Sequence, residues 1–155
     1  FGNHWRNTKK MTHWENAWKH SFEYHMYVDL AEYYQDNKRV KFKIEKWYFN
    51  YLPVYDKILR FHHWHNVKFG GWIGWLYIPT NKAIAQWNKG KRADIDVFWH
   101  YHQMIDWGNF ICNGSMIGRW PYAESIKASP ERPAQALFLI NSKYWKTISA
   151  PIILE

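Results

Sequence analysis

The chain has 155 residues, 47% of them hydrophobic, so it is long enough to form one ordinary domain with its own core. Its 22% of charged residues excludes a disordered tail, and its single cysteine excludes a disulfide framework or a zinc finger. Aromatic residues make up 21%, more than a small core needs, and a net charge of +8 favours nucleic acid, phospholipid headgroups or an acidic protein as partner.

The N-terminal third predicts a long amphipathic helix over residues 12–36. Thr12 to Glu15 fits a capping box, because the threonine hydroxyl and the glutamate can each satisfy an amide of the first turn. Apolar residues then recur at helical spacing: Trp14, Trp18, Phe22, Met26 and Leu30. Such a stripe indicates either core packing or a helical arm against a partner, and we expect partner contacts at Trp14, Trp18, Phe22 and Met26.

The middle of the chain predicts short elements. Residues 40–46 alternate like a strand, but the apolar spacing up to Leu52 also fits a helix, which we favour. After Pro53 we expect a short helix up to His62, then an irregular aromatic segment over residues 66–80. Thr80 caps a predicted short helix that ends at Asn88, and a basic turn follows at residues 89–92.

The C-terminal third predicts two more helices. One begins at Asp94 as N-cap and carries apolar residues up to Ile105, and the other covers residues 130–140. A glycine-containing loop separates them. The predicted fold class is therefore mostly α: an irregular single domain of short helices, residues 1–155, with a long N-terminal amphipathic helix at residues 12–36 as a helical arm.

Two features bear on targeting and membranes. The sequence does not begin with Met, so we expect either a removed presequence or a start inside a longer protein. The most apolar run, residues 69–78, is too short as a helix to cross a bilayer. With a mean hydropathy of −0.61 we expect a soluble or peripheral chain.

Histidines form two clusters that raise a metal hypothesis. His62 and His65 would share one helix face, and His100 and His102 form a second pair that Asp106 could complete. Neither pair has the acidic residues of di-iron bundles or the spacing of a metalloprotease helix. We therefore expect neutral histidines in an aromatic core or interface, with no metal and no other cofactor.

Nucleophilic catalysis has little support in the sequence. Residues 114–118 superficially resemble a nucleophile elbow around Ser115, but the G-x-S-x-G spacing is absent. Cys112 is expected to be a small buried hydrophobe. We therefore predict no catalytic residues and no enzyme.

Basic residues gather in two clusters with aromatic neighbours. The candidate contacts for anionic lipid or nucleic acid are Lys38, Arg39, Lys41, Lys43, Lys46, Lys82, Lys89, Lys91 and Arg92. Trp47 and Tyr48 follow the first cluster, and Trp87 lies inside the second. These clusters fit a solvated face, an anionic membrane surface with tryptophan and tyrosine at the headgroups, or RNA with bases stacked on rings.

In this overall composition the chain resembles supernumerary subunits of mitochondrial inner-membrane energy complexes, the respiratory chain and ATP synthase. The resemblance implies a structural accessory subunit without catalysis, located in the mitochondrion at the inner membrane. Its implied partners are other protein subunits of a large complex, with anionic lipid headgroups as a further contact and no small-molecule substrate of its own. A mitochondrial ribosomal or other RNA-binding protein is the first alternative, and a His-rich metal protein or enzyme is the second.

Overall fold

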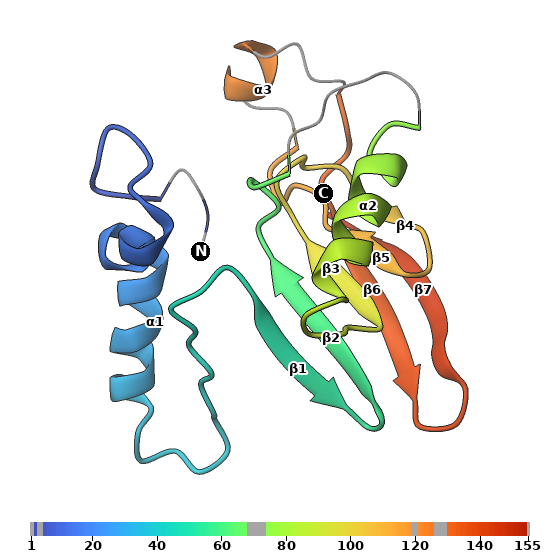
Figure 1. Cartoon of the computed structure of the whole chain (residues 1–155), viewed down its shortest axis with the longest axis horizontal. Helices are drawn as coiled ribbons and strands as arrows, with labels where there is room; N and C mark the ends of the chain where they lie inside the picture. Colours follow the sequence, from blue (N-terminus) through green and yellow to red (C-terminus); the bar gives the residue numbers. More distant parts are fainter. Residues whose placement is uncertain (1, 3–4, 68–73, 119–120, 126–129, 155) are drawn as a thin grey trace.

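The computed structural model describes residues 2, 5–67, 74–118, 121–125 and 130–154, and mixes helices with strands (Figure 1). In chain order the elements are η1 Trp14–His20, α1 Phe22–Tyr33, β1 Asn50–Val54, β2 Lys57–His62, α2 Tyr77–Trp87, β3 Ile95–Phe98, β4 Ile105–Asp106, β5 Phe110–Cys112, α3 Pro121–Ser125, β6 Ala134–Asn141 and β7 Trp145–Ile153.

A five-stranded mixed sheet, in the order β1-β2-β3-β5-β4, forms the centre of the structure. Strands β2, β3 and β5 are parallel, with Phe98 of β3 opposite both His62 and Cys112. The outer strands β1 and β4 are antiparallel to their neighbours. Because the three inner strands run the same way, their carboxyl ends meet at one edge of the sheet.

Helix α2 connects β2 to β3 and lies against the sheet (Figure 1). Ile84 on this helix packs with Trp64, Phe98, Phe110 and Cys112 in a cluster of buried side chains. The rings of Trp64 and Phe98 stack with 4.4 Å between their centroids, and Phe98 stacks in turn on Phe110. This stack fixes the ends of the parallel strands, where the candidate site lies.

Strands β6 and β7 form a separate two-stranded antiparallel sheet. Asn113, just after β5, joins it to the central sheet, because its side chain donates to Gln135 and accepts from the amide of Ala136. A second connection comes from Asp106 of β4, whose carboxylate binds Lys146 and Ser149 of β7. Polar contacts thus join the two sheets.

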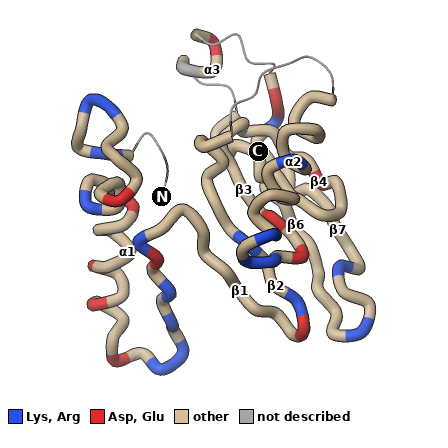
Figure 2. The backbone as a smooth tube through the Cα atoms, in the orientation of Figure 1, with Lys and Arg blue, Asp and Glu red and all other residues tan. Residues whose placement is uncertain are grey.

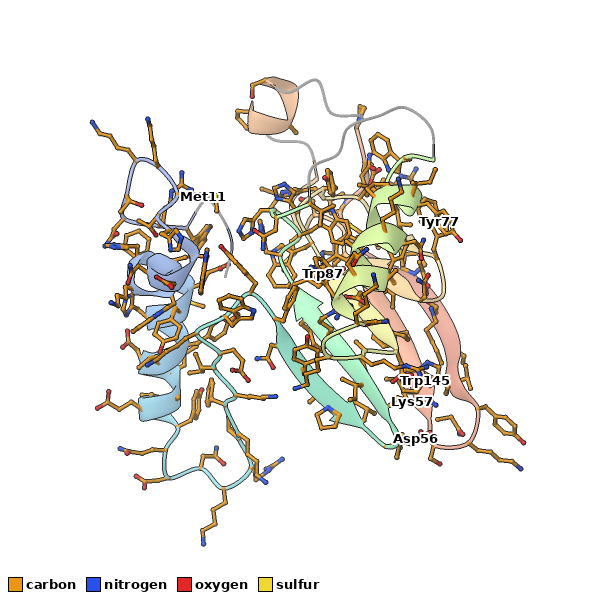
Figure 3. The ribbon with its side chains drawn as sticks, viewed as in Figure 1. Met11, Asp56, Lys57, Tyr77, Trp87 and Trp145 are labelled. Carbon is orange, nitrogen blue, oxygen red and sulfur yellow. The ribbon has the colours of Figure 1, made fainter. Side chains whose placement is uncertain are left out.

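The N-terminal helices stand beside the sheet and contribute little to the core (Figure 1). No residue of η1 or α1 is buried, although Ser21 between them is. The Ser21 hydroxyl caps α1 by accepting the amide of Tyr24. Lysine and arginine residues lie along the extended segment after α1 (Figure 2). Asp56 and Lys57 form an ion pair at the β1–β2 turn (Figure 3).

The predicted mostly α fold class is wrong, because 28% of the described residues form strands and 25% form helices. The predicted helices that end at His62 and begin at Asp94 are strands β2 and β3, and the one predicted at residues 130–140 is mainly β6. Inner parallel strands carry apolar residues on both faces, so a short apolar run fits both the two-residue repeat of a strand and the 3.6-residue repeat of a helix. The Asp94 carboxylate does not cap a helix but accepts the amide of Ile58 on β2.

Other predicted elements are closer to the structure. The helix predicted up to Asn88 is confirmed as α2, although it begins three residues before Thr80, which is buried inside it. The predicted N-terminal helix is two helices, a 3-10 helix and α1, that meet at Ser21. The helix favoured over residues 40–52 is wrong, because residues 40–45 have no regular structure and β1 begins at Asn50.

Part of the predicted aromatic segment, residues 68–73, lies outside the described residues. Within the described part of the chain, no helix is both long enough and apolar enough to cross a membrane.

Candidate functional site

Three histidines meet at the carboxyl edge of the parallel strands. His63 and His65 follow β2, and His100 follows β3 one strand further along the sheet. Ligand sites in open α/β sheets lie at this edge, because the loops that leave neighbouring strands converge there. We call His63, His65 and His100 the histidine cluster.

The rings of the histidine cluster are close enough to act together. The Nδ1 atoms of His63 and His65 are 3.2 Å apart. The ring of His100 lies edge-on to that of His63, with 4.9 Å between the ring centroids. His63 is buried, while His65 and His100 are half-buried. The cluster therefore combines imidazole nitrogens with partial access from solvent.

The backbone around the cluster adopts conformations that L-amino acids rarely take. Trp64, between the first two histidines, has φ +74°, and His102, two residues after His100, has φ +59°. Such positions cost on the order of 1–3 kcal/mol each and concentrate at functional sites. Here they turn the chain sharply at the end of each strand, so neighbouring loops present their histidines at one edge.

Aromatic side chains and one carboxylate surround the cluster. Trp99 contacts the ring of His63, and Tyr48 contacts the ring of His65, with 5.7 and 5.3 Å between ring centroids. Gly2 lies between His63 and Glu23: its amide donates to the Glu23 carboxylate, and a Cβ there would come within 3.3 Å of the His63 Nε2 atom. The N-terminal region thus reaches the cluster at Gly2, which Glu23 of α1 holds in place.

A buried charge network lies behind this edge. Arg60 donates two hydrogen bonds to Asp96, from Nε at 2.7 Å and from an Nη at 2.9 Å, and a ring nitrogen of His62 lies 3.1 Å from the same carboxylate. Burial lowers the pKa of His62 despite this contact with Asp96. Burial also acts to lower the pKa of Arg60, but the hydrogen bonds and charge of Asp96 outweigh it and raise that pKa. The network holds β2 to β3 and is almost completely buried.

The histidine pairs predicted from the sequence are not the ones that the structure brings together. His62 belongs to the buried network rather than to a helix face shared with His65. Asp106 binds Lys146 and Ser149 and completes no site with His102. The sequence analysis did not single out His63. Two histidines two residues apart directly after a strand are the pattern that could have indicated it.

Imidazole nitrogens at this spacing suit either a hydrogen bond or a shared metal ion. Two nitrogens on one tetrahedral zinc ion, each at about 2.0–2.1 Å, lie roughly 3.3 Å apart. Within the described residues, no three His, Cys, Asp or Glu side chains are already placed around one ion. His100 would have to turn a ring nitrogen toward His63 and His65 to supply a third ligand.

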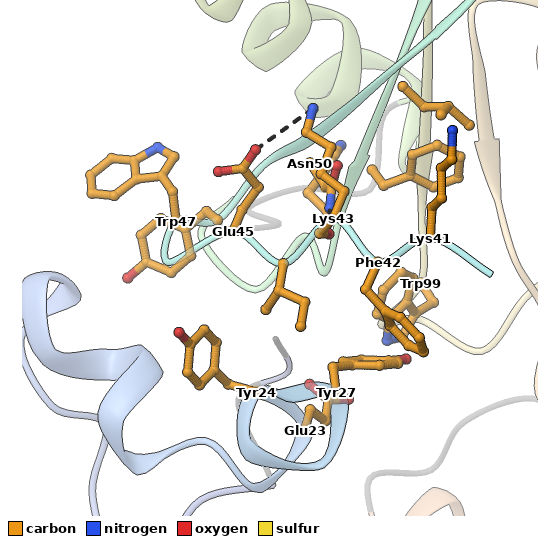
Figure 4. Close-up of a pocket in the computed structure, with 15 residues that line it drawn as sticks. Glu23, Tyr24, Tyr27, Lys41, Phe42, Lys43, Glu45, Trp47, Asn50 and Trp99 are labelled. Carbon is orange, nitrogen blue, oxygen red and sulfur yellow. Dashed lines mark hydrogen bonds and ion pairs between the residues drawn. The ribbon is translucent and has the colours of Figure 1, made fainter. Parts of the chain in front are cut away.

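A cleft of about 440 Å³ opens beside the cluster. Its lining residues come from α1, from the segment that leads into β1, and from the strand ends: Glu23, Tyr24, Tyr27, Lys41, Phe42, Lys43, Ile44, Glu45, Trp47, Tyr48, Asn50, Leu52, Phe61, His62 and Trp99. Figure 4 shows Tyr24 and Tyr27 of α1 across from the segment that carries Phe42 and Trp47. We call this space the aromatic cleft.

The two predicted basic clusters approach each other at Tyr51. Lys43 donates to the Tyr51 carbonyl and also pairs with Glu45, while the Lys91 ammonium lies 4.1 Å from the centre of the Tyr51 ring. Lys46 lies over the ring of Trp18. The remaining basic candidates lie on the exposed surface: Lys38, Arg39 and Lys41 after α1, Lys82 on α2, and Lys89 and Arg92 after it.

The predicted partner residues are on the surface. Trp14, Phe22 and Met26 are exposed, while Trp18 is half-buried. Such exposed side chains are consistent with protein partners in general, but nothing supports a specific complex. Cys112, as predicted, is buried, and burial raises the pKa of its thiol to about 12.

Comparisons with known proteins give only distant likeness. No protein-family model matches the chain, and no curated protein matches it. Among solved structures, wild-type Vps29 complexed with Zn²⁺ from Entamoeba histolytica has a TM-score of 0.45 and 16% identity over 74% of this chain and 67% of its own. A single mutant of the same Vps29 gives the same TM-score and identity and is covered over 65% of its length.

The predicted function, a structural accessory subunit of a respiratory complex or ATP synthase, is wrong. The comparisons give no support to a mitochondrial accessory subunit. The prediction assumed a chain of short irregular helices, and the five-stranded mixed sheet shows that this assumption is wrong. The mitochondrial location stays a prediction.

Proposed function

We propose that the protein is a metal-dependent hydrolase of phosphate esters, with its reactive centre at the histidine cluster. One observation carries the proposal: imidazole nitrogens of His63 and His65 lie 3.2 Å apart at the carboxyl edge of parallel strands, with His100 beside them. This is the His-rich metal protein or enzyme that the sequence left open as its second alternative.

His63, His65 and His100 would hold the metal ion. Imidazole suits zinc and other first-row transition metals, and three protein ligands leave a position open for water or substrate. A zinc ion in such a site lowers the pKa of its water to about 7, which supplies a nucleophile at neutral pH. His65 and His100 are half-buried, so part of each side chain is accessible to solvent.

Neighbouring residues would shape the reaction space. Trp99 and Tyr48 pack on the rings of His63 and His65, so they hold the imidazole planes and limit the water around them. The net charge of +8 favours an anionic substrate, and Lys41 and Lys43 line the adjoining cleft. Phosphate esters meet both conditions, since their oxygens bind metal ions and carry negative charge.

The test measures bound metal and hydrolysis in the same preparations. The full chain, loaded with zinc or manganese and desalted, should hold at least one ion per molecule and should hydrolyse bis(p-nitrophenyl) phosphate. His63→Ala and His65→Ala should each lower metal affinity and kcat/KM by about 100-fold or more, since even the outer neighbours of metal ligands are worth 10- to 100-fold.

His25→Ala is the matched control, because His25 is exposed on α1, where its ring contacts the Lys19 carbonyl and the ring of Tyr24 and none of the three cluster histidines among the contacts described. It should leave both metal content and hydrolysis unchanged. If no metal is retained, or if His63→Ala hydrolyses the diester as fast as the wild type, the proposal is wrong.

A further inference from the structure

We propose that the aromatic cleft binds the base of a nucleotide and thereby directs its phosphate to the histidine cluster. This inference names the substrate class of the proposed hydrolase and rests on that proposed function for the placement of the phosphate. The base site itself is argued from the cleft alone.

The cleft has the size and walls that a nucleobase requires. Its volume of about 440 Å³ falls in the range of small-molecule sites, roughly 300–1,000 Å³. Tyr27 lies on the α1 side, Phe42 on the opposite segment, and Trp99 at the end of β3 (Figure 4). Rings from three separate parts of the chain therefore line one space, and every base has a π face that can stack on them.

These rings are costly to leave in water. Tyr27 is 48% exposed and Trp99 is 40% exposed, although both are large aromatic side chains. A planar ligand that covers them would remove this apolar surface from solvent without moving the backbone. An aliphatic ligand would gain burial as well, but it would lack the stacking contribution of a base.

Polar groups at the cleft can read the edge of a base. Glu23 supplies a carboxylate that also accepts the Gly2 amide, and Asn50 supplies the oxygen of an amide whose nitrogen donates to the Lys43 carbonyl. Lys41 adds a cation, while Lys43 is already bound to Glu45 and to the Tyr51 carbonyl. Base edges present both donors and acceptors, so a mixed set of this kind suits them better than a purely anionic or purely apolar ligand. A cleft lined by lysine as its only polar residue would instead favour a small anion such as inorganic phosphate.

Two rings separate the cleft from the histidine cluster and contact both. Trp99 lines the cleft and contacts His63, while Tyr48 lines the cleft and contacts His65. A base that stacks on Trp99 therefore lies next to the histidines, and the sugar and phosphate of the same molecule can reach them. This geometry points to a mononucleotide rather than to an isolated base.

The experiment compares ligands that differ only in the base. Calorimetric titration of the chelator-treated full chain with adenosine monophosphate and with ribose 5-phosphate measures what the base contributes without hydrolysis. We expect the nucleotide to bind at least about tenfold more tightly, as stacking on one aromatic side chain provides. Tyr27→Ala and Trp99→Ala should each remove most of that preference, and Trp99→Phe should restore part of it.

Tyr144→Ala is the matched control, since Tyr144 is an exposed ring at the β6–β7 turn and does not line the cleft. The inference is wrong if the wild type binds adenosine monophosphate and ribose 5-phosphate equally tightly. It is also wrong if Tyr27→Ala keeps the wild-type preference for the nucleotide. The two proposals fail separately: nucleotide preference without metal or hydrolysis would refute the hydrolase, whereas hydrolysis without preference would refute the base site.

Discussion

The parallel strands and the N-terminal helices use similar side chains in opposite ways. Around β3 and β5, the rings of Trp64, Phe98 and Phe110 stack on one another and are almost completely buried. In α1, Phe22 and Met26 are exposed, and no residue of the helix is buried. Hydrophobic content alone therefore does not create a core here, because burial needs a second layer such as α2 on the sheet.

The largest effect expected from this comparison is at Asp96, inside the sheet. Asp96→Ala would leave the Arg60 charge buried without its carboxylate and would remove the partner of His62. Breaking a buried ion pair in this way costs about 3–5 kcal/mol. Chemical denaturation followed by circular dichroism should show that loss in the free energy of unfolding.

Asp56 provides the matched acid outside the core. Its side chain is 69% exposed and pairs with Lys57 at the β1–β2 turn. Asp56→Ala should cost no more than about 1 kcal/mol, as exposed pairs do. Equal losses at Asp56 and Asp96 would contradict the contrast between a buried network and a solvated turn.

A smaller effect is expected at Asp106, which joins the central sheet to β7. Asp106→Asn should weaken the bonds to Lys146 and Ser149 and cost about 1–3 kcal/mol at neutral pH. Although burial acts to raise the pKa of Asp106, the hydrogen bonds from Lys146, Ser149 and Gly108 outweigh it and lower that pKa.

The sign of this pKa shift fixes the pH dependence. A lowered pKa in the folded state means that the stabilisation is present above about pH 4, the ordinary aspartate range, and is lost as the pH falls through the folded pKa. The difference between the wild type and Asp106→Asn should therefore shrink in acid. Thermal unfolding of both proteins between pH 7 and pH 3 measures it, and a difference that grows in acid would contradict this assignment.

Elements set by local signals could be predicted, while those set by long-range pairing could not. The turn at residues 89–92 and the helix before it follow from nearby residues, and the structure has both. Strand β3 depends on partners far away in the sequence, because Ile95 lies opposite Leu59. Nothing within a window of eleven residues distinguishes such a strand from a buried helix.

The same limit applies to the candidate site. The sequence showed that histidines are clustered, but a helical interpretation paired His62 with His65. His63 and His65 instead follow the end of β2, where the left-handed conformation of Trp64 turns the chain and brings their rings together, and β3 brings His100 to them. The contact between residues 63 and 100 depends on the parallel pairing of β2 with β3. A single sequence does not reveal that pairing, so it could not predict the contact.

Hydrogen exchange should sharpen the comparison between sheet and helix. Amides of β3 and β5 lie in the middle of the sheet, so they should exchange only through openings close to global unfolding. Amides of α1 should exchange faster by at least about tenfold, since this helix has no buried residue to hold it. Mass-spectrometric exchange on the isolated chain measures both, and equal protection would show that α1 folds cooperatively with the sheet.

The smallest effect is expected at Met26, which lies in the middle of α1 and is 41% exposed. In the isolated chain, Met26→Ala should change the free energy of unfolding by no more than about 0.5 kcal/mol, because alanine favours a helix and little packing is lost. A buried methionine would cost about 2–5 kcal/mol instead, so denaturation separates the two cases clearly. A loss of that size would place α1 in the core and contradict the contrast with the sheet. If the free energy of unfolding is nearly unchanged, Met26 does not pack in this chain's own core. Met26→Ala should then weaken the binding of a protein partner, which is the role predicted for Met26.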